Sequence, residues 1–362
     1  MIDRRSLLSL VLAGTAALVV ACNKGGDKAS GGEATGSENV TLNGAGATFP
    51  YPLYSKWMSE YNKQHPNVRI NYQSIGSGGG IRQISARTVD FGATDAPMKD
   101  EEAKKAPGTL IHIPTTLGAV VVTYNVPDYT GSLKLTPDVI ADVFLGKITK
   151  WNDERITGPN PDAKLPDKNI SVVYRSDGSG TTAVFTEYLA KVSDEFKDKV
   201  GAGKSVKWPT GLGAKGNEGV TGQIKTTPGS IGYVELAYAL QNKLPTAAIK
   251  NKAGEFVQPA IAAITKAADG VELPDSMHAS ITDSATPGAY PISSFTYILV
   301  YEDAKDAAKG KAVAEFLKWA IHDGQKFADA LHYAPLPDAV VKKVETKLET
   351  LRSGDKKLLS GS

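Results

Sequence analysis

The sequence contains few of the residues that build disulfide frameworks and transition-metal sites. Its 362 residues include one cysteine and five histidines, and the histidines are scattered along the chain. No His-Glu-x-x-His motif occurs, and a lone cysteine cannot form an intrachain disulfide. We therefore expect no metal site, no cofactor and no disulfide-stabilised fold.

The chain also lacks an excess of charge of either sign. It has 41 basic and 39 acidic residues, which give a formal net charge of +2. Such a balance gives no reason to expect nucleic acid or an anionic membrane surface as a partner. If the protein binds an anion, local geometry must hold that anion, because the overall field is weak.

Two motifs of nucleotide enzymes and hydrolases are missing. The sequence has neither a G-x-S-x-G nucleophile elbow nor a G-x-x-x-x-G-K-[ST] phosphate loop. Residues Gly211–Gly216 match the G-x-G-x-x-G pattern, but Trp208-Pro209-Thr210 precede them where a dinucleotide site needs a strand. We interpret this segment as a plain loop.

The one long apolar run lies at the N-terminus. Leu7–Ala21 follows two arginines and is too short to span a bilayer as a mature helix. It ends at Cys22, which resembles the acylated cysteine of a bacterial lipoprotein signal. We expect residues 1–21 to be a signal peptide and the polar residues 22–39 to be a flexible tether. Export by the general or the twin-arginine route stays open.

A strand–turn–helix pattern recurs in the remaining chain. Three turns rich in glycine and hydroxyl residues, Gly44–Phe49, Gly76–Gly80 and Gly178–Thr182, follow β-type runs and lead into helical patterns. A further β run, Val89–Ala93, ends beside Asp95. The pattern predicts an α/β fold with ligand groups at the carboxyl ends of strands. The free N–H groups at a helix start favour a bound anion.

The stretch Val173–Tyr188 has the strongest anion-binding character. Its Arg175 offers a charged fork suited to an oxyanion, and Asp177 follows two residues later. Three hydroxyl residues of the turn add further hydrogen-bond donors: Ser179, Thr181 and Thr182. A small anion is the occupant that this stretch predicts.

The length favours two domains over one. Two β-branched runs, Gly118–Val126 and Ser294–Tyr301, flank a central segment with helices and strands of its own. The economical layout is an insertion with two crossings, which predicts a two-strand hinge and a cleft between lobes. Lobe I would comprise residues 40–120 and 295–362, and lobe II residues 121–294.

Helical periodicity is clear at three places. In Pro50–Gln64, apolar residues recur every four positions, and a proline at the start is tolerated. Two further amphipathic patterns follow the second β-branched run, at Ala307–Ile321 and Pro337–Leu351. We expect a helix at each of these places.

Several motifs together closely resemble the phosphate-binding protein of the bacterial ABC-type phosphate importer. They are LNGAGATFPYPLYSKW, SIGSGGGIRQI, VDFGATDAPM, YRSDGSGTTAVFTEYL, VKWPTGLGAKGNEGV and GSIGYVE. The similarity runs from about Val40 to near Leu351. It implies a type II periplasmic binding protein fold with two α/β lobes, a two-strand hinge and phosphate in the central cleft. It also implies a monomeric, non-enzymatic receptor whose partners are the importer's permease and ATPase subunits.

The resemblance also implies a ligand set for phosphate. Its members are Thr48, the Phe49 backbone, Ser77, Asp95, Arg175, Ser179, the Gly180 backbone and Thr181, with Asp177 holding the arginine fork. A carboxylate such as Asp95 repels a fully ionised anion but can accept a proton from phosphate, which sulfate cannot offer. The alternative role for Asp95 is to cap the Ala96-Pro97 turn.

Two other classes of function stay open at this point. An exported phosphatase or phosphoryl-transfer enzyme would need a nucleophile or a metal centre, and the sequence shows no ligand cluster for one. A receptor for another tetrahedral oxyanion would use the same turns. For each class we expect a location in the periplasm or on the outer face of the cytoplasmic membrane, with a lipid anchor.

Overall fold

The computed structural model describes residues 39–359. The predicted signal peptide, Cys22 and all of the tether except its last residue lie outside the described residues, so these predictions are not tested. Residues 39–359 belong to one compact unit. The proposed division of this unit into lobes I and II stays a prediction.

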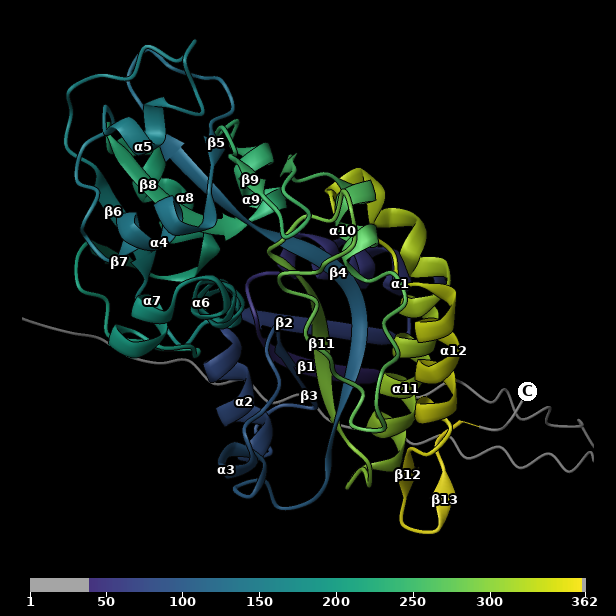
Figure 1. Cartoon of the computed structure of the whole chain (residues 1–362). Coiled ribbons are helices and arrows are strands. Elements are labelled where there is room, and N and C mark those ends of the chain that lie inside the picture. Colours follow the sequence, from purple (N-terminus) through teal and green to yellow (C-terminus); the bar gives the residue numbers. More distant parts are fainter. Residues whose placement is uncertain (1–38, 360–362) are drawn as a thin grey trace, which may run out of the picture. The chain divides into compact units, whose positions relative to one another are not determined.

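The fold is built on an eight-stranded sheet with the strand order β2-β1-β3-β11-β4-β8-β6-β7 (Figure 1). Its strands are β1 (Val40–Gly46), β2 (Val68–Ser74), β3 (Phe91–Thr94), β4 (Leu110–Asn125), β6 (Ser171–Arg175), β7 (Leu212–Ala214), β8 (Ser230–Glu235) and β11 (Ser293–Tyr301). Strands β1, β2 and β3 are mutually parallel where they pair, and so are β6, β7 and β8. The two antiparallel strands β4 and β11 lie between these parallel groups.

Smaller strand groups lie outside this sheet. They are β5 (Lys134–Leu135), β9 (Ala248–Lys250) and β10 (Phe256–Val257) in one sheet, and β12 (Arg352–Ser353) and β13 (Lys356–Lys357) in a hairpin. The helices are α1 (Tyr51–Gln64), α2 (Ser77–Ser85), α3 (Asp100–Ala103), α4 (Pro137–Phe144), α5 (Glu154–Thr157), α6 (Gly180–Val192), α7 (Asp194–Lys199), α8 (Gly216–Thr226), α9 (Leu236–Gln241), α10 (Ile261–Ala267), α11 (Ala307–Ile321) and α12 (Asp338–Leu348). Two 3₁₀ turns, η1 (Asp323–Phe327) and η2 (Asp329–Leu331), follow α11.

Strand β4 joins the two parallel groups because it changes its partner along its length. It pairs with β11 as far as Ala119 and with β8 from Val120 onward. The strand begins at Leu110, eight residues before the predicted start of the β-branched run at Gly118. Its interior residues are all buried, as expected for a strand that is covered on both faces.

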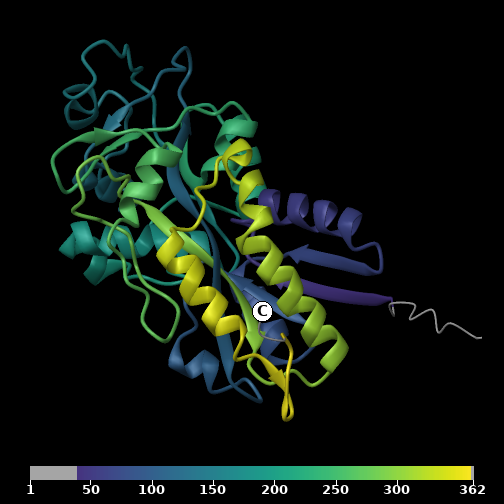
Figure 2. The same cartoon turned by 90° about the vertical axis from the view of Figure 1, so that its right-hand side faces the viewer.

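The three strongest helical predictions are confirmed. Helix α1 buries Leu53, Trp57 and Tyr61 on one face, and the Trp57 indole N–H donates to the Gly324 carbonyl at 2.7 Å. Helix α11 has the predicted bounds. Helix α12 is shorter than predicted at both ends and lies beside α11 (Figures 1 and 2). Among residues 39–359, no helix combines the length and apolarity needed to cross a membrane.

Three predicted turn boundaries are wrong. Strand β1 continues to Gly46, although the sequence placed a turn from Gly44. Helices α2 and α6 begin at Ser77 and Gly180, inside the predicted glycine turns. Close packing explains the glycines. A Cβ atom on Gly80 would clash with the backbone of Gly46 and Ala45, so helix α2 can approach β1 only without a side chain there.

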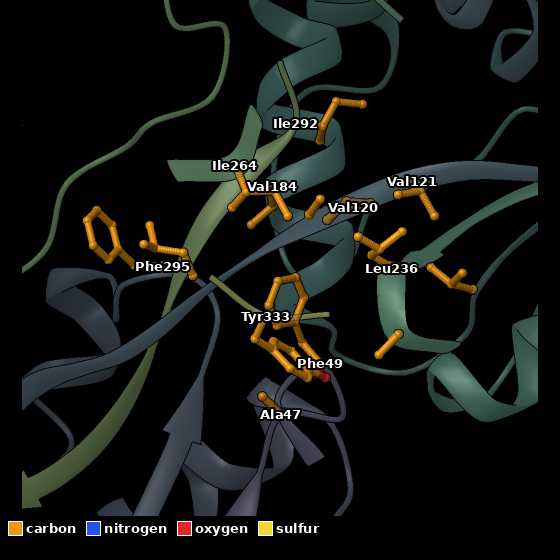
Figure 3. Close-up of a cluster of buried hydrophobic side chains, with 14 of the residues drawn as sticks. Ala47, Phe49, Val120, Val121, Val184, Leu236, Ile264, Ile292, Phe295 and Tyr333 are labelled. Carbon is orange, nitrogen blue, oxygen red and sulfur yellow. The ribbon is translucent and has the colours of Figure 1, made fainter. Parts of the chain in front are cut away.

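The apolar core continues across β4. Figure 3 shows Val120 on this strand and, in the same buried cluster, Phe49 and Tyr333. A Cβ atom on Gly118 of β4 would meet the Phe49 ring. The ring centroids of Phe49 and Tyr333 are 6.4 Å apart, and both residues are fully buried. The segment after β1 is therefore fixed by contacts with the C-terminal part of the chain.

Candidate anion-binding site

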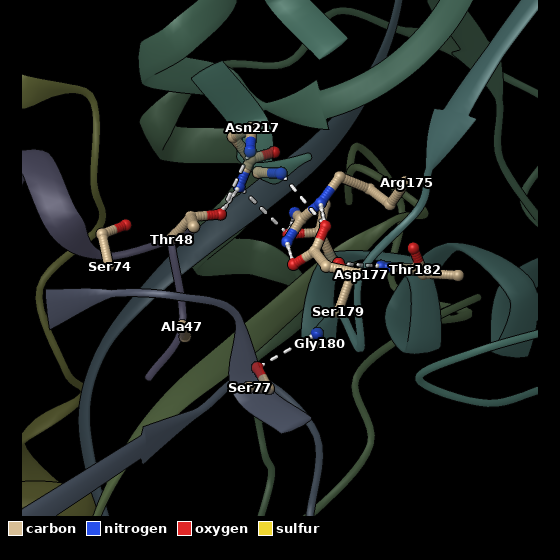
Figure 4. Close-up of polar contacts among 12 residues, drawn as sticks. Ala47, Thr48, Ser74, Ser77, Arg175, Asp177, Ser179, Gly180, Thr182 and Asn217 are labelled. Atoms are coloured by element: carbon tan, nitrogen blue, oxygen red, sulfur yellow. Dashed lines mark hydrogen bonds and ion pairs between the residues drawn. The ribbon is translucent and has the colours of Figure 1, made fainter. Parts of the chain in front are cut away.

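The predicted site residues come together at the carboxyl ends of strands. Thr48 follows β1, Asp95 follows β3 and Arg175 ends β6. Ser77 and Gly180 begin helices α2 and α6, and Figure 4 shows them with Thr48 and Arg175. Their exposed fractions are small: Thr48 2%, Ser77 0%, Asp95 2%, Arg175 4%, Ser179 0% and Thr181 0%. Buried polar groups at this density need partners of their own or a bound ligand.

The two glycine-rich turns contact each other directly. The Gly180 N–H donates to Ser77 Oγ at 3.0 Å, and the Gly78 N–H donates to the Gly178 carbonyl at 2.8 Å. A Cβ atom on Gly180 would collide with Ser77 Oγ and with the Asp95 carboxylate. Only glycine therefore allows helix α6 to begin this close to the end of β3.

Arg175 is held in a bidentate pair with Asp177. Its Nε and Nη2 atoms lie 2.8 and 2.7 Å from the two carboxylate oxygens, and the Gly216 N–H donates to Asp177 Oδ1 at 3.0 Å. Burial raises the pKa of Asp177, but the hydrogen bonds and the charge of Arg175 outweigh burial and lower the pKa overall. The guanidinium is fixed in direction, with Nη1 turned toward Thr181 Oγ1 at 3.4 Å.

Asp95 lies in a different environment. Its Oδ1 accepts a hydrogen bond from the Thr296 hydroxyl at 2.9 Å, and Ser77 Oγ lies 3.4 Å from its Oδ2. Burial raises the pKa of Asp95 to about 7, against the opposing effects of these hydroxyls and of the Arg175 charge. This carboxyl group therefore changes its protonation close to neutral pH.

The alternative role for Asp95 as the cap of the following turn is wrong. The Ala96 N–H is directed to Thr94 Oγ1 at 3.3 Å, and the Thr94 hydroxyl in turn donates to the Ala96 carbonyl at 2.5 Å. Thr94 makes the local turn contacts, and the Asp95 carboxylate is left facing Ser77 and Thr296.

The hydroxyl residues of the α6 turn have different roles. Ser179 caps the helix, because its Oγ accepts the Thr182 N–H at 3.0 Å. The Thr182 hydroxyl pairs with the Tyr233 hydroxyl at 2.7 Å, and the Tyr233 hydroxyl oxygen also accepts the Arg175 backbone N–H at 3.2 Å. Thr182 is therefore linked to the site through Tyr233, and Ser179 and Thr181 stay in the candidate set.

The backbone carbonyl of Phe49 is held by Tyr333. The Tyr333 hydroxyl donates to the Phe49 carbonyl at 2.7 Å and also lies 3.1 Å from Glu235 Oε2. Burial raises the pKa of Glu235 well above its usual value. These contacts hold in place the start of the segment that leads from β1 into α1.

Sequence reasoning missed a fourth strand–turn–helix unit. The segment that we interpreted as a loop contains strand β7, which pairs with β6, and leads into helix α8 at Gly216. Asn217 in this helix donates from Nδ2 to Thr48 Oγ1 at 2.8 Å and to Thr181 Oγ1 at 3.2 Å. The available signal was a glycine-rich turn followed by a helical pattern, as in the other three units.

The candidate site contains no metal-ligand constellation. Within residues 39–359, no group of three or more histidine, cysteine, aspartate or glutamate side chains is arranged to hold a metal ion. The site supplies hydroxyl and N–H groups that donate hydrogen bonds, one guanidinium, and one carboxyl group that titrates close to neutral pH.

Comparison with known proteins assigns the family. A family model described as a PBP superfamily domain matches residues 31–323. A Xylella fastidiosa protein named phosphate-binding protein PstS is 46% identical over 345 residues, which cover 91% of this chain and 94% of that protein. The chain belongs to the PstS family. PstS of Pasteurella multocida is 49% identical over 88% of this chain and 93% of its own length. The family resemblance inferred from the motifs is thereby confirmed.

Solved structures agree on the fold. A periplasmic phosphate-binding protein bound with phosphate has a TM-score of 0.68 at 23% identity, and the match covers 85% of this chain and 93% of that chain. A phosphate-binding protein from Stenotrophomonas maltophilia has a TM-score of 0.63 at 19% identity, with coverages of 85% and 93%. The predicted periplasmic binding protein fold of the PstS family is confirmed.

Proposed function

We propose that this protein binds inorganic phosphate with high affinity outside the cytoplasmic membrane and delivers it to an ABC phosphate importer. The identity of 46–49% to proteins named PstS, over about nine tenths of the chain, supports this function. The buried donor set around Arg175 supports it independently, because hydroxyl and N–H groups with a single cation suit a small tetrahedral anion.

The observation that carries the proposal is the pairing of this donor set with Asp95. A phosphate ion at neutral pH carries one or two protons, so it can accept from most of the site and donate to one carboxylate. The proposed ligands are Thr48, the Phe49 backbone, Ser77, Asp95, Arg175, Ser179, the Gly180 backbone and Thr181. Asp177 would hold the guanidinium fork without touching the anion.

The partners and the location belong to the same proposal. The receptor would act as a monomer, perform no reaction on its ligand, and release phosphate to a membrane permease driven by cytoplasmic ATPase subunits. Acyl chains on Cys22 would anchor it in the periplasm or on the outer face of the cytoplasmic membrane. Replacing Cys22 by serine should abolish labelling with radioactive fatty acid and release the protein from the membrane fraction. Unchanged labelling would exclude this anchor.

Calorimetric titration tests the main proposal. The protein from Asn23 onward, unfolded and refolded to remove bound anion, is titrated with phosphate and then with sulfate at neutral pH. We expect one phosphate per chain, tight binding and no sulfate signal. Binding of both anions would make the protein a general oxyanion receptor. The absence of both signals would refute the proposal, and release of phosphate from a phosphate ester would instead support the enzyme class.

A further inference from the structure

We propose that Asn217 sets the direction of the two threonine hydroxyls in the anion site, so that both donate to the ligand. Asn217 lies in the first turn of α8 and is fully buried. It is absent from the ligand set that the family resemblance implies. The assignment rests on the proposed phosphate site and adds a residue that acts through Thr48 and Thr181.

The orientation of the Asn217 side-chain amide is fixed by its surroundings. Its Oδ1 accepts the backbone N–H of Glu235 at 3.0 Å, and a backbone N–H can only donate. The NH₂ group must therefore face the opposite way, toward Thr48 Oγ1 at 2.8 Å and Thr181 Oγ1 at 3.2 Å. A reversed amide would bring two donors together at Glu235.

The hydrogen-bond count then decides what the two hydroxyls can do. A threonine hydroxyl has one O–H to donate and two lone pairs that accept. Thr48 Oγ1 accepts from Asn217 twice, from Nδ2 and from the backbone N–H at 3.2 Å. Thr181 Oγ1 accepts from Asn217 Nδ2 and from Arg175 Nη1 at 3.4 Å. The lone pairs of both oxygens are occupied, and each O–H is left to donate.

Neither hydroxyl uses its proton within the part of the chain that the structure describes. Among the hydrogen bonds of residues 39–359, Thr48 Oγ1 and Thr181 Oγ1 occur only as acceptors. Both side chains are at most 2% exposed, so an unused O–H would be costly in the ligand-bound protein. An anion, which offers acceptors on every side, is the partner that satisfies both.

Asn217 also connects segments that are distant in sequence. Thr48 follows β1, and Thr181 lies in the first turn of α6, on the side of the sheet formed by β6 and β8 (Figure 4 shows Thr48, Asn217 and Arg175). One NH₂ group binds both hydroxyl oxygens and thereby fixes the distance between them. Without the Asn217 NH₂ group, each threonine hydroxyl could rotate and turn a lone pair, instead of its O–H, toward the anion.

Coupling between substitutions tests this role. Asn217→Leu keeps the branched shape of asparagine but removes its donors, and Asn217→Ala serves as a second variant that differs in volume. We expect each to weaken phosphate binding by about 10- to 100-fold, measured by calorimetry beside thermal unfolding of the ligand-free protein. In a Thr48→Val/Thr181→Val background, the same change at position 217 should weaken binding by about threefold or less.

A matched background separates the hydroxyls from the packing of the threonine methyl groups. In Thr48→Ser/Thr181→Ser, which keeps both hydroxyls, the full penalty at position 217 should persist. An equal penalty in the valine background would overturn the assignment, and so would failure of both position 217 variants to fold, since Asn217 would then serve the fold. If the wild-type protein bound no phosphate, the proposed function would be refuted as well. If the wild-type protein bound phosphate normally and the losses of affinity at positions 217, 48 and 181 were additive, only the role of Asn217 would be refuted.

Discussion

Two carboxylates are under the influence of Arg175, and their pKa values shift in opposite directions. Asp177 accepts two hydrogen bonds from the guanidinium and one from the Gly216 N–H, and its pKa falls. Asp95 is more deeply buried and has hydroxyl neighbours, Thr296 and Ser77, and its pKa rises to about 7.

The difference shows that two carboxylates near one cation can have different roles. Asp177 forms a bidentate ion pair with Arg175 and fixes the direction of the guanidinium. Asp95 receives too little compensation to stay fully ionised at neutral pH, because burial dominates. A ligand that brings its own proton relieves this cost, so the poorly compensated carboxylate can discriminate between anions and the well-compensated one cannot.

Removing the discriminating carboxylate should have the largest effect. We expect Asp95→Asn to reduce the preference for phosphate over sulfate by roughly 10²–10⁴-fold, since an amide N–H can donate to a fully ionised oxygen. Competitive calorimetry with the two anions measures this preference. Asp177→Asn is the matched control and should keep it. If Asp95→Asn still excludes sulfate as fully as the wild type, Asp95 has no part in selection.

Removing the shared cation should have the next largest effect. Arg175→Ala deletes the charge and leaves Asp177 without its main partner, which predicts a loss of phosphate affinity of about 10²–10³-fold. Arg155→Ala is the control, because Arg155 pairs with Asp142 at the surface and its side chain is 46% exposed. A loss below tenfold in the Arg175 variant would contradict the central place of this cation.

The opposite pKa shifts predict opposite effects of pH on stability. The pKa of Asp95 is raised in the folded protein. Its contribution to the free energy of unfolding is therefore full below about pH 4 and is lost as the pH rises through 7. Ligand-free Asp95→Asn should therefore gain roughly 2–4 kcal/mol relative to wild type between pH 4 and 8. Asp177 has a lowered pKa, so Asp177→Asn should be less stable than wild type at pH 7, and the gap should narrow below about pH 4.

Denaturant unfolding at four pH values between about 3.5 and 8, a range that covers both transitions, measures both curves. The two variants are of the same size and charge, so each is the control for the other. Curves that run parallel to wild type would show that the two carboxylates do not differ as described.

A partly exposed ion pair should give the smallest effect. Lys204 Nζ lies 2.8 Å from Glu102 Oε2 and 3.1 Å from the Pro97 carbonyl, in a groove beside Gly78 and Gly178. Lys204→Ala should speed phosphate dissociation by about 2- to 10-fold in stopped-flow measurements, and added salt should shrink the difference. Lys99→Ala, in the same groove, is the control. A rate equal to wild type would show that this ion pair does not help retain the ligand.

Local features of the site were predictable from the sequence because they depend on near neighbours. Arg175 and Asp177 are two residues apart, and their pairing needs only the end of one strand and the turn after it. The Ser179 cap is likewise local, although α6 starts at Gly180, two residues before the end of the predicted turn. The bounds of α11 followed from its periodicity alone.

Distant contacts were missed because no local pattern encodes them. Asn217 is 169 positions from Thr48, and Thr296 is 201 positions from Asp95. Asn217 follows the three-residue strand β7, in which two residues are exposed and one is partly exposed, so no hydrophobic run indicated a strand there. Thr296 lies within a β-branched run that the sequence marks only as a buried strand.

The sequence by itself determined that glycine-rich turns lead from strands into helices and that Asp177 lies within reach of Arg175, since glycines, capping hydroxyls and an adjacent carboxylate act over a few residues. The tertiary structure decided which groups face one another. Strand β4 changes its partner from β11 to β8 at Val120, and this places the end of β1 close to the starts of α6 and α8. Burial at that meeting point raises the pKa of Asp95 and leaves the Thr48 and Thr181 hydroxyls as donors, because both outcomes depend on which atoms exclude water.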